Sequence, residues 1–264
     1  MPIQRIDSLD DPRVAAYRNL RDRTLRGESI FVTEGAVLTR RLLASRYQAE
    51  SLLLTDEFAE EFAALAPDVP RYVADQELLL AVVGFPFHRG VLGAGRRGPD
   101  RSLDDLFAGR DRQAPFKMIV CPEITKPENM GLIFRSAGAL GLDAVLLGQR
   151  SCDPFSRRCL RCSMGGVFDL PWVKSADLLC DLARVKEDYG LELWASVLDA
   201  QAQRLDEVLW PARAGLLIGN EFEGLRADSL ALCDQRVTIP MQPGVDSLNM
   251  GVAAGIFMYL MTRR

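Results

Sequence analysis

A cluster of polar residues near the end of the chain lies between an apolar run and a helix of small residues. The apolar run Val237-Thr238-Ile239 leads through a turn at Pro243-Gly244 to Asp246, Ser247 and Asn249. The segment that follows, up to Gly255, contains mostly small residues. Side-chain oxygens and backbone amides gathered between a strand end and a helix are typical of a loop that faces a ligand.

A second segment repeats this arrangement. The short apolar strand Leu216-Leu217-Ile218 ends in Gly219-Asn220-Glu221 and then reaches Gly224. The two glycines permit tight backbone geometry and the close approach of another group. Asn220 and Glu221 follow a strand end directly, and α/β sheets bind ligands at that edge.

A third segment begins after the apolar strand Met118-Ile119-Val120. Its apolar residues recur at helical spacing from Asn129 to Leu140, with Arg135 among them. Asn129 would cap this helix, contact a ligand, or do both. Arg135 is either a charge on the surface of an amphipathic helix or part of a site.

Residues 128–147, 216–225 and 239–257, taken in this order, resemble the SpoU (TrmH-type) branch of the SPOUT methyltransferase superfamily. The resemblance implies an enzyme that transfers a methyl group from S-adenosylmethionine to a ribose 2′-hydroxyl in structured RNA, with rRNA favoured over tRNA. It also implies a homodimer. The implied fold is α/β, with a mostly parallel C-terminal sheet that contains a deep trefoil knot. A small α/β domain, similar to an RNA-binding ribosomal protein, would precede it.

The resemblance also assigns site residues. The implied catalytic residues are Arg135, Asn129, Glu221, Ser247 and Asn249, and the implied cofactor-binding residues are Ile218, Gly219, Asn220, Ile239, Met241 and Leu248. In the family, the arginine that matches Arg135 is often assigned as the general base. Because arginine stays protonated in proteins, the alternative is that Arg135 holds a phosphate and stabilises the forming alkoxide.

The other polar residues also have alternative roles. Glu221 would orient Arg135 or Asn129, or is a surface acid. Ser247 and Asn249 would orient the ribose or Arg135, and Ser247 alternatively caps the last helix. Two further functions stay open: methylation of a base nitrogen, and a non-catalytic RNA-binding protein of the same fold.

Composition limits the location and the partners. The 264 residues carry a net charge of −4, which argues against a uniformly basic surface for nucleic acid but allows a local patch. No apolar run is long enough for a membrane helix, and the acidic N-terminal stretch is unlike a secretory signal, so a cytoplasmic protein without a membrane partner is expected. Cys159 and Cys162 have metal-ligand spacing, but no second pair accompanies them, so no metal site is expected.

The alternation of strands and helices in the first half of the chain predicts a small α/β domain over residues 1–92. The resemblance implies that this domain binds the RNA. An arginine-rich helix is expected within residues 1–27. Strands are expected at 30–32, 51–54, 71–73 and 87–91, and helices at 37–43, 57–66 and 75–82. Residues 93–114 are interpreted as a linker with one helical turn at 103–107. Gly93, Gly95 and Gly98 match a dinucleotide-binding pattern, but the following Pro99 breaks the helix that such a pattern requires.

Residues 115–264 predict the methyltransferase domain, a mostly parallel sheet covered on both faces. Strands are expected at 117–121, 144–148, 192–197, 215–219 and 236–240, with a short strand at 167–170. Helices are expected at 129–140, 176–188, 204–208, 227–233 and 248–261. Arg157, Arg158 and Arg161 would contact RNA phosphates or form a solvated charge run.

Overall fold

A computed structural model describes residues 3–20, 29–245 and 247–263 of the chain. The chain divides into two compact units, which are described separately below. The first unit consists of Met1–Pro99 and Phe155–Phe168, and the second consists of Asp100–Pro154 and Asp169–Arg264.

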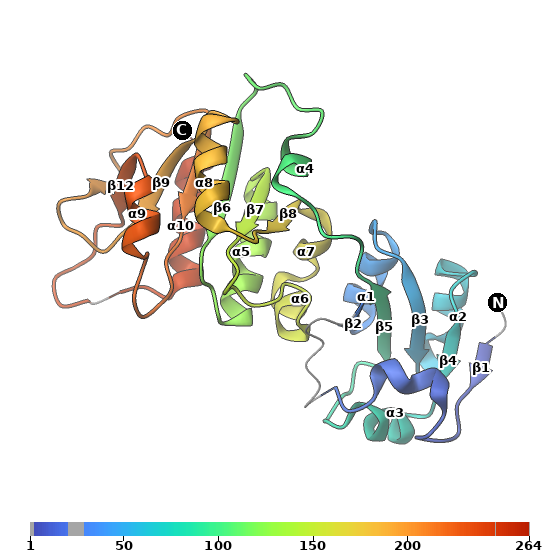
Figure 1. Ribbon diagram of the computed structural model, residues 1–264. Coiled ribbons are helices and arrows are strands. Elements are labelled where there is room, and N and C mark those ends of the chain that lie inside the picture. Colours follow the sequence, from blue (N-terminus) through green and yellow to red (C-terminus); the bar gives the residue numbers. More distant parts are fainter. Residues whose placement is uncertain (1–2, 21–28, 246, 264) are drawn as a thin grey trace. The chain divides into compact units, whose positions relative to one another are not determined.

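The first unit is built on a five-stranded mixed sheet with the order β1-β4-β3-β5-β2. Pairs β1–β4 and β3–β4 are parallel, whereas β3–β5 and β2–β5 are antiparallel. The elements of this unit, coloured blue to green in Figure 1, are β1 (Ile3–Arg5), the 3-10 helix η1 (Pro12–Tyr17), β2 (Ile30–Glu34), α1 (Ala36–Leu43), β3 (Ala49–Leu54), α2 (Asp56–Leu65), β4 (Arg71–Val73), α3 (Gln76–Val83) and β5 (Val91–Arg96).

Both faces of this sheet are covered. On one face, Val32, Leu53 and Leu92 pack with η1 and α3. On the other face, Leu52, Leu54 and neighbouring apolar residues pack with α2. Alternate residues of one strand point to opposite faces, which explains why β3 contributes to both clusters. The predicted α/β character of this region is confirmed.

A segment distant in sequence completes the first unit. Helix α6 (Arg157–Ser163) and the start of α7 (Gly166–Asp169) belong to it. The ring of Phe155 stacks on that of Phe31 with centroids 4.6 Å apart, and Phe168 lies 5.5 Å from the same ring. These buried aromatic contacts tie residues 155–168 to strand β2.

The arginine-rich helix expected within residues 1–27 is much shorter than expected in the described part. Residues 3–5 form β1, which pairs with β4, and only Pro12–Tyr17 are helical. Asp11 caps this short helix, accepting a hydrogen bond from the amide of Arg13. The chain then leaves the helix at Arg18, whose backbone is extended. The arginines of residues 21–28 lie outside the described residues.

The first residues of the expected linker are a buried strand. Gly93 and Gly95 lie in β5, which begins at Val91, so the strand expected at 87–91 is displaced toward the C-terminus. A Cβ atom on Gly95 would lie 2.4 Å from Cζ of Phe31. Glycine is therefore used at this position because it lets an aromatic ring pack against the strand backbone. The short helix in this region is confirmed as α4 (Leu103–Phe107).

The second unit contains a parallel sheet of seven strands among the described residues, with the order β10-β12-β9-β11-β6-β7-β8. Every neighbouring pair is parallel. Its further elements are β6 (Phe116–Cys121), α5 (Pro127–Leu140), β7 (Ala144–Leu147), β8 (Trp172–Lys174), α8 (Leu178–Glu187), β9 (Glu192–Ser196), β10 (Gln203–Arg204), β11 (Arg213–Leu217), α9 (Ala227–Leu232), β12 (Gln235–Thr238) and α10 (Met250–Arg263).

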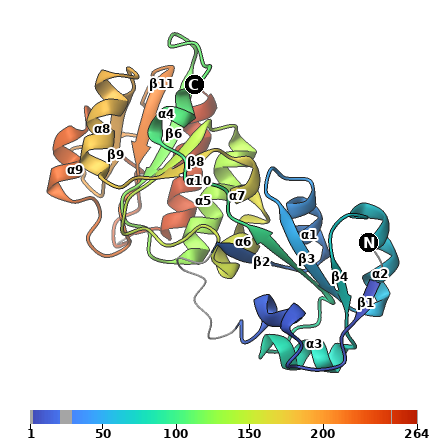
Figure 2. The ribbon, with the colours of Figure 1, turned by 45° about the vertical axis from the view of Figure 1, so that its right-hand side comes forward.

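Helices cover both faces of this sheet, as predicted. Figure 2 shows α8 and α9 on one side of strands β6, β9 and β11, with α5 and α10 on the other side. Met118 and Val120 pack in the cluster that contains α4 and α8. Lys117 points to the opposite face, where its ammonium group donates to the carbonyl of Met261 in α10.

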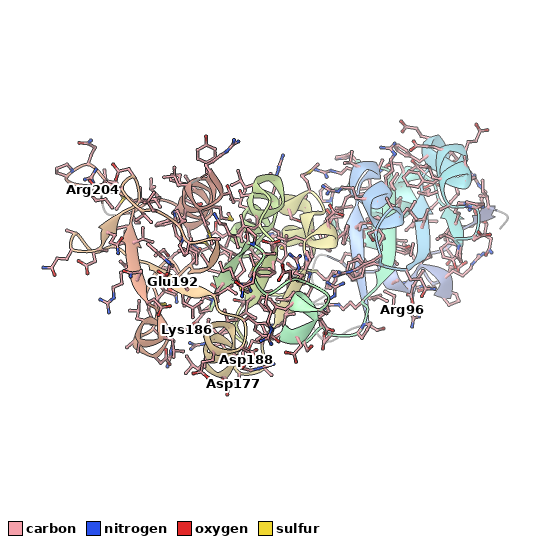
Figure 3. The ribbon with its side chains drawn as sticks, turned by 90° about the horizontal axis from the view of Figure 1, so that it is seen from above. Arg96, Asp177, Lys186, Asp188, Glu192 and Arg204 are labelled. Carbon is pink, nitrogen blue, oxygen red and sulfur yellow. The ribbon has the colours of Figure 1, made fainter. Side chains whose placement is uncertain are left out.

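The side chains labelled in Figure 3 on this unit include Asp177 and Asp188, which lie at the two ends of α8. Asp177 caps the helix by accepting a hydrogen bond from the amide of Cys180. Lys186 forms an ion pair of 2.8 Å with Asp234, just before β12. Arg204 lies in the edge strand β10 and pairs with Asp206.

Two predictions of secondary structure in the second half of the chain are wrong. The strand expected at 167–170 is instead a helical turn with Val167 and Phe168 buried, and the strand β8 begins after Pro171. The helix expected at 204–208 is replaced by β10, which pairs with β12. Both errors concern segments of three to five residues, for which tertiary contacts override local pattern.

The structure confirms the α/β fold with its parallel sheet, and the trefoil knot stays a prediction. Among the helices of residues 3–20, 29–245 and 247–263, none is long and apolar enough to cross a bilayer.

Candidate functional site

The candidate site is a cavity of about 620 Å³ in the second unit. It is lined by residues that follow strands β9, β11 and β12, together with Lys126, which follows β6. Since the four strands are parallel neighbours, their carboxyl ends meet at one edge of the sheet. This shared edge brings together four segments that are far apart in the sequence.

The loop after β11 is held by its own backbone. The amide of Ile218 donates to the carbonyl of Val120 at 2.9 Å, which extends the sheet by one residue. Asn220 and Gly224 exchange two backbone hydrogen bonds, of 3.1 and 3.2 Å. A Cβ atom on Gly219 would lie 2.4 Å from the carbonyl carbon of Gly224. Only glycine therefore allows this loop to close so tightly.

A chain of polar side chains crosses the wall of the cavity. The amide nitrogen of Asn249 donates to Oδ1 of Asn129 at 3.3 Å, and the amide nitrogen of Asn129 donates to Oε1 of Glu221. The ammonium group of Lys126 lies 3.5 Å from the same carboxylate oxygen. Asn129 itself is buried, whereas Glu221, Asn249 and Lys126 line the cavity. Three segments separated in sequence are thus fixed by one hydrogen-bonded chain.

The second carboxylate oxygen of Glu221 is different. Oε2 is buried and has no hydrogen-bond partner among the described residues. A buried polar atom without a partner has a free-energy cost, so native structures rarely leave one unless a water or ligand satisfies it. This oxygen therefore indicates where a hydrogen-bond donor binds.

The segment after β12 supplies the remaining wall. Ile239, Met241 and Leu248 contribute apolar surface, and Ser247 lies beside them. Oδ1 of Asn249 accepts a hydrogen bond of 3.2 Å from the amide of Val252, so Asn249 caps the first turn of α10. Sequence reasoning had offered Ser247 as the helix cap. Asp246 lies outside the described residues.

Of the eleven predicted site residues, nine line the cavity and Asn129 is bonded to two of those nine. Arg135 differs, since it is exposed on α5 and is absent from the cavity wall of its own chain. Glu221 bonds to Asn129 and pairs with Lys126 rather than with Arg135. The catalytic and cofactor-binding roles themselves stay predictions.

An exposed apolar stripe runs close to Arg135. It consists of Leu132 on α5 and of Val252, Ile256 and Tyr259 on α10, two helices that pack against each other. Arg135 lies one helical turn beyond Leu132. A contiguous exposed apolar surface of this kind is typical of an interface with another protein.

Sequence reasoning missed several residues of the cavity wall, notably Lys126, Phe222 and Ser196–Leu198. Two signals were available. Ser196 is the last residue of β9 and Val197 and Leu198 follow it, and the carboxyl ends of parallel strands share one edge. Lys126 and Phe222 are sequence neighbours of Asn129 and Glu221, which had been selected.

The chain is similar to proteins that are named RNA methyltransferases. It is 35% identical to an uncharacterized tRNA/rRNA methyltransferase of Mycobacterium bovis, and the similarity covers 100% of this chain and 93% of that protein. It is 29% identical to the 23S rRNA (guanosine-2′-O-)-methyltransferase RlmB of Acinetobacter baylyi over 70% of this chain and 75% of that protein.

A solved structure shares the fold. The AdoMet-bound rRNA methyltransferase from Sinorhizobium meliloti superimposes with a TM-score of 0.85, at 24% identity, over 99% of this chain and 98% of that one. The model of the SpoU rRNA Methylase family matches residues 117–259, which contain every residue of the cavity wall. The chain therefore belongs to the SpoU rRNA Methylase family.

Proposed function

We propose that this protein transfers the methyl group of S-adenosylmethionine to a ribose 2′-hydroxyl in ribosomal RNA. The chain of hydrogen bonds from Asn249 through Asn129 to Glu221, beside a cavity of about 620 Å³, is the observation that carries the proposal. The relative RlmB, whose name specifies a guanosine 2′-oxygen in 23S rRNA, supports the choice of the ribose oxygen. Cytoplasmic location stays a prediction.

The cavity fits the proposed cofactor. Its volume lies within the range of about 300–1,000 Å³ that is usual for sites of small ligands. Ile218, Ile239, Met241 and Leu248 would hold the apolar adenine ring, and backbone groups near Gly219 would bond to its edge. When bound, S-adenosylmethionine supplies an electrophilic methyl group on a positively charged sulfur. The unpaired Oε2 of Glu221 would accept a hydrogen bond from a donor at this site.

The chain must also activate the ribose hydroxyl, which is a weak nucleophile. A guanidinium group placed beside the 2′-oxygen would stabilise the negative charge that develops there as the proton leaves. Arg135 has this chemistry but lies outside the cavity of its own chain. We infer that the protein acts as a homodimer, in which Arg135 of one subunit completes the site of the other.

The exposed stripe of Leu132, Val252, Ile256 and Tyr259 supports this homodimer. In a twofold dimer the same surface of both subunits is buried, so the stripe would be covered by its own copy. Arg135 lies next to the stripe on α5 and would reach the partner across such an interface.

A methyl-transfer assay tests the proposed reaction. The protein is incubated with labelled S-adenosylmethionine and with rRNA from cells that lack the gene, and the RNA is then hydrolysed in alkali. A 2′-O-methyl group blocks cleavage of the adjacent phosphodiester, so labelled dinucleotides are expected. Labelled mononucleotides would instead indicate methylation of a base, and absence of label would contradict the proposed function.

The Arg135→Ala variant tests the role of Arg135. We expect kcat to fall by about a hundredfold or more, because transition-state charge is no longer stabilised. Affinity for S-adenosylmethionine, measured by calorimetry, should stay unchanged. Arg204→Ala removes a surface arginine of the edge strand and serves as the matched control. Full activity of Arg135→Ala would remove this residue from the mechanism.

Mixing two inactive variants tests the shared site. If Arg135 acts in the partner's site, an equimolar mixture of Arg135→Ala and Glu221→Gln should recover about a quarter of wild-type activity after subunit exchange. Half of the dimers would be mixed, and each mixed dimer would contain one intact site. Absence of recovery, with mixed dimers demonstrated by mass spectrometry, would show that each subunit uses its own Arg135.

A further inference from the structure

Phe222 is the most exposed of the large apolar side chains in the described part of the chain, at 85%. It lies in the loop after β11, between Glu221 and Glu223, and it also lines the cavity. An aromatic ring at this position gains no free energy from burial in the folded protein. Single exposed apolar side chains are common, but this one lines the candidate cavity, where its aromatic face is available to a ligand.

The backbone around Phe222 is rigidly held. Oδ1 of Asn220 accepts hydrogen bonds from the amides of Phe222 and Glu223, at 2.9 and 2.7 Å. The backbone pairing of Asn220 with Gly224 closes the same loop. On one side of Phe222, Glu221 is anchored by Asn129. The ring thus projects from a preorganised loop, and a ligand that stacks on it would pay little ordering entropy.

A cation lies beside the ring. The ammonium group of Lys126 is 5.3 Å from the centroid of Phe222, and it also lies 3.5 Å from Oε1 of Glu221. About half of the Lys126 side chain remains exposed, so the ammonium group is accessible to an anion. A flat apolar surface next to a positive charge complements a nucleotide, which combines a planar base with a phosphate.

We propose that Phe222 is the stacking surface for an unpaired base of the RNA substrate, and that Lys126 binds the phosphate of the same strand. This inference rests on the proposed function, which brings a ribose of the RNA to the cavity that Phe222 lines. Proteins commonly read such unstacked bases on aromatic side chains. The adenine of the cofactor is assigned instead to the apolar wall formed by Ile218, Ile239, Met241 and Leu248.

Kinetics of three variants test the stacking surface. Stacking on an aromatic ring contributes enough that Phe222→Leu should raise KM for rRNA by about tenfold or more, with kcat nearly unchanged. Affinity for S-adenosylmethionine should stay at the wild-type value. Phe222→Tyr keeps the aromatic face and should retain a KM close to wild type. Leu209→Ala alters a residue of equal exposure, 82%, that lies outside the cavity wall, and should leave KM unchanged.

Three other results would overturn the inference, and each would identify a different reason. An unchanged KM in Phe222→Leu would show that no base stacks there. Weaker cofactor binding with unchanged KM for RNA would make Phe222 a cover for the cofactor. Equal losses in Phe222→Tyr and Phe222→Leu would exclude stacking on the aromatic face. Failure of the wild-type protein to methylate any RNA would contradict the proposed function itself, so the two failures are distinguishable.

Discussion

Two glutamates, one in each unit, occupy similar positions and have different surroundings. Glu34 ends strand β2 and is 3% exposed, and Glu221 follows strand β11. Arg157 donates to one oxygen of Glu34, and Arg161 lies 3.3 Å from the other. In Glu221, by contrast, Asn129 and Lys126 share one oxygen, and the other has no partner among the described residues.

We propose that this difference separates a structural carboxylate, Glu34, from a functional one, Glu221. Glu34 is satisfied at both oxygens, and its partner Arg157 also donates to the carbonyl of Leu20 and lies over the ring of Phe85. Glu34 thereby anchors α6 within the first unit. Glu221 retains an unused acceptor beside a cavity, which costs stability unless a ligand binds. Among the buried side-chain atoms of this kind in the described residues, Oε2 of Glu221 is the one whose residue lines the cavity.

Removing the carboxylate of Glu34 should have the largest effect on stability. In Glu34→Ala the guanidinium of Arg157 loses its buried partner, and we expect a loss of about 3–5 kcal/mol in the free energy of unfolding. Urea denaturation monitored by circular dichroism measures it. Glu50→Ala, which breaks the more exposed ion pair with Arg96 (Figure 3), is the matched control and should cost much less. Equal losses in both variants would contradict the structural role of Glu34.

Changing Glu221 in the second unit should affect methyl-transfer activity rather than stability. Glu221→Gln keeps an oxygen acceptor for Asn129 but removes the charge, so we expect stability to change by less than about 1 kcal/mol. Methyl transfer should fall by about a hundredfold, because the donor bound at Oε2 is no longer held by a carboxylate. Glu207→Gln, on an exposed side chain outside the cavity, is the control. Full activity, or a stability loss as large as that of Glu34→Ala, would remove the contrast between the two glutamates.

The smallest expected effect is on RNA binding and concerns Lys126. Its ammonium group pairs with Oε1 of Glu221, the oxygen that Asn129 also contacts. Lys126→Met should weaken RNA binding a few-fold and should lower the slope of log Kd against log salt by about 0.7–1, as for the loss of one phosphate contact. Filter binding between roughly 50 and 200 mM KCl measures this slope. Lys186→Met, which removes a cation of α8 outside the cavity, should leave the slope unchanged. An unchanged slope in Lys126→Met would show that Lys126 serves only to pair with Glu221.

Arg157 illustrates why the role of a charged residue was hard to predict. The sequence offered RNA phosphates or solvent as its surroundings, because a run of arginines suggests a solvated or phosphate-binding surface. The structure pairs Arg157 with buried Glu34, more than a hundred residues earlier in the chain. Nothing local to residues 156–163 encodes that partner.

The strands and long helices were largely predictable, because apolar periodicity is a local property of the sequence. The helix beginning near Asn129 and the strands ending near Val120, Leu217 and Thr238 were found with small errors in their bounds. Short segments were less predictable. Gly93 and Gly95 look like linker residues, yet they lie in a buried strand, where Thr33 and Thr39 pack against Gly93 and Phe31 packs against Gly95.

By itself, the sequence determined the parallel sheet of the second unit, two segments that line the cavity, 216–225 and 239–257, and nine residues of its wall. Only the tertiary structure decided that Asn129 bonds to Glu221, that Arg135 lies outside the cavity of its own chain and that Phe222 is exposed beside Lys126. The reason is physical: local pattern specifies which segments become strands and helices. The direction of a side chain, and the partner it meets, depend on the packing of elements that are distant in the sequence.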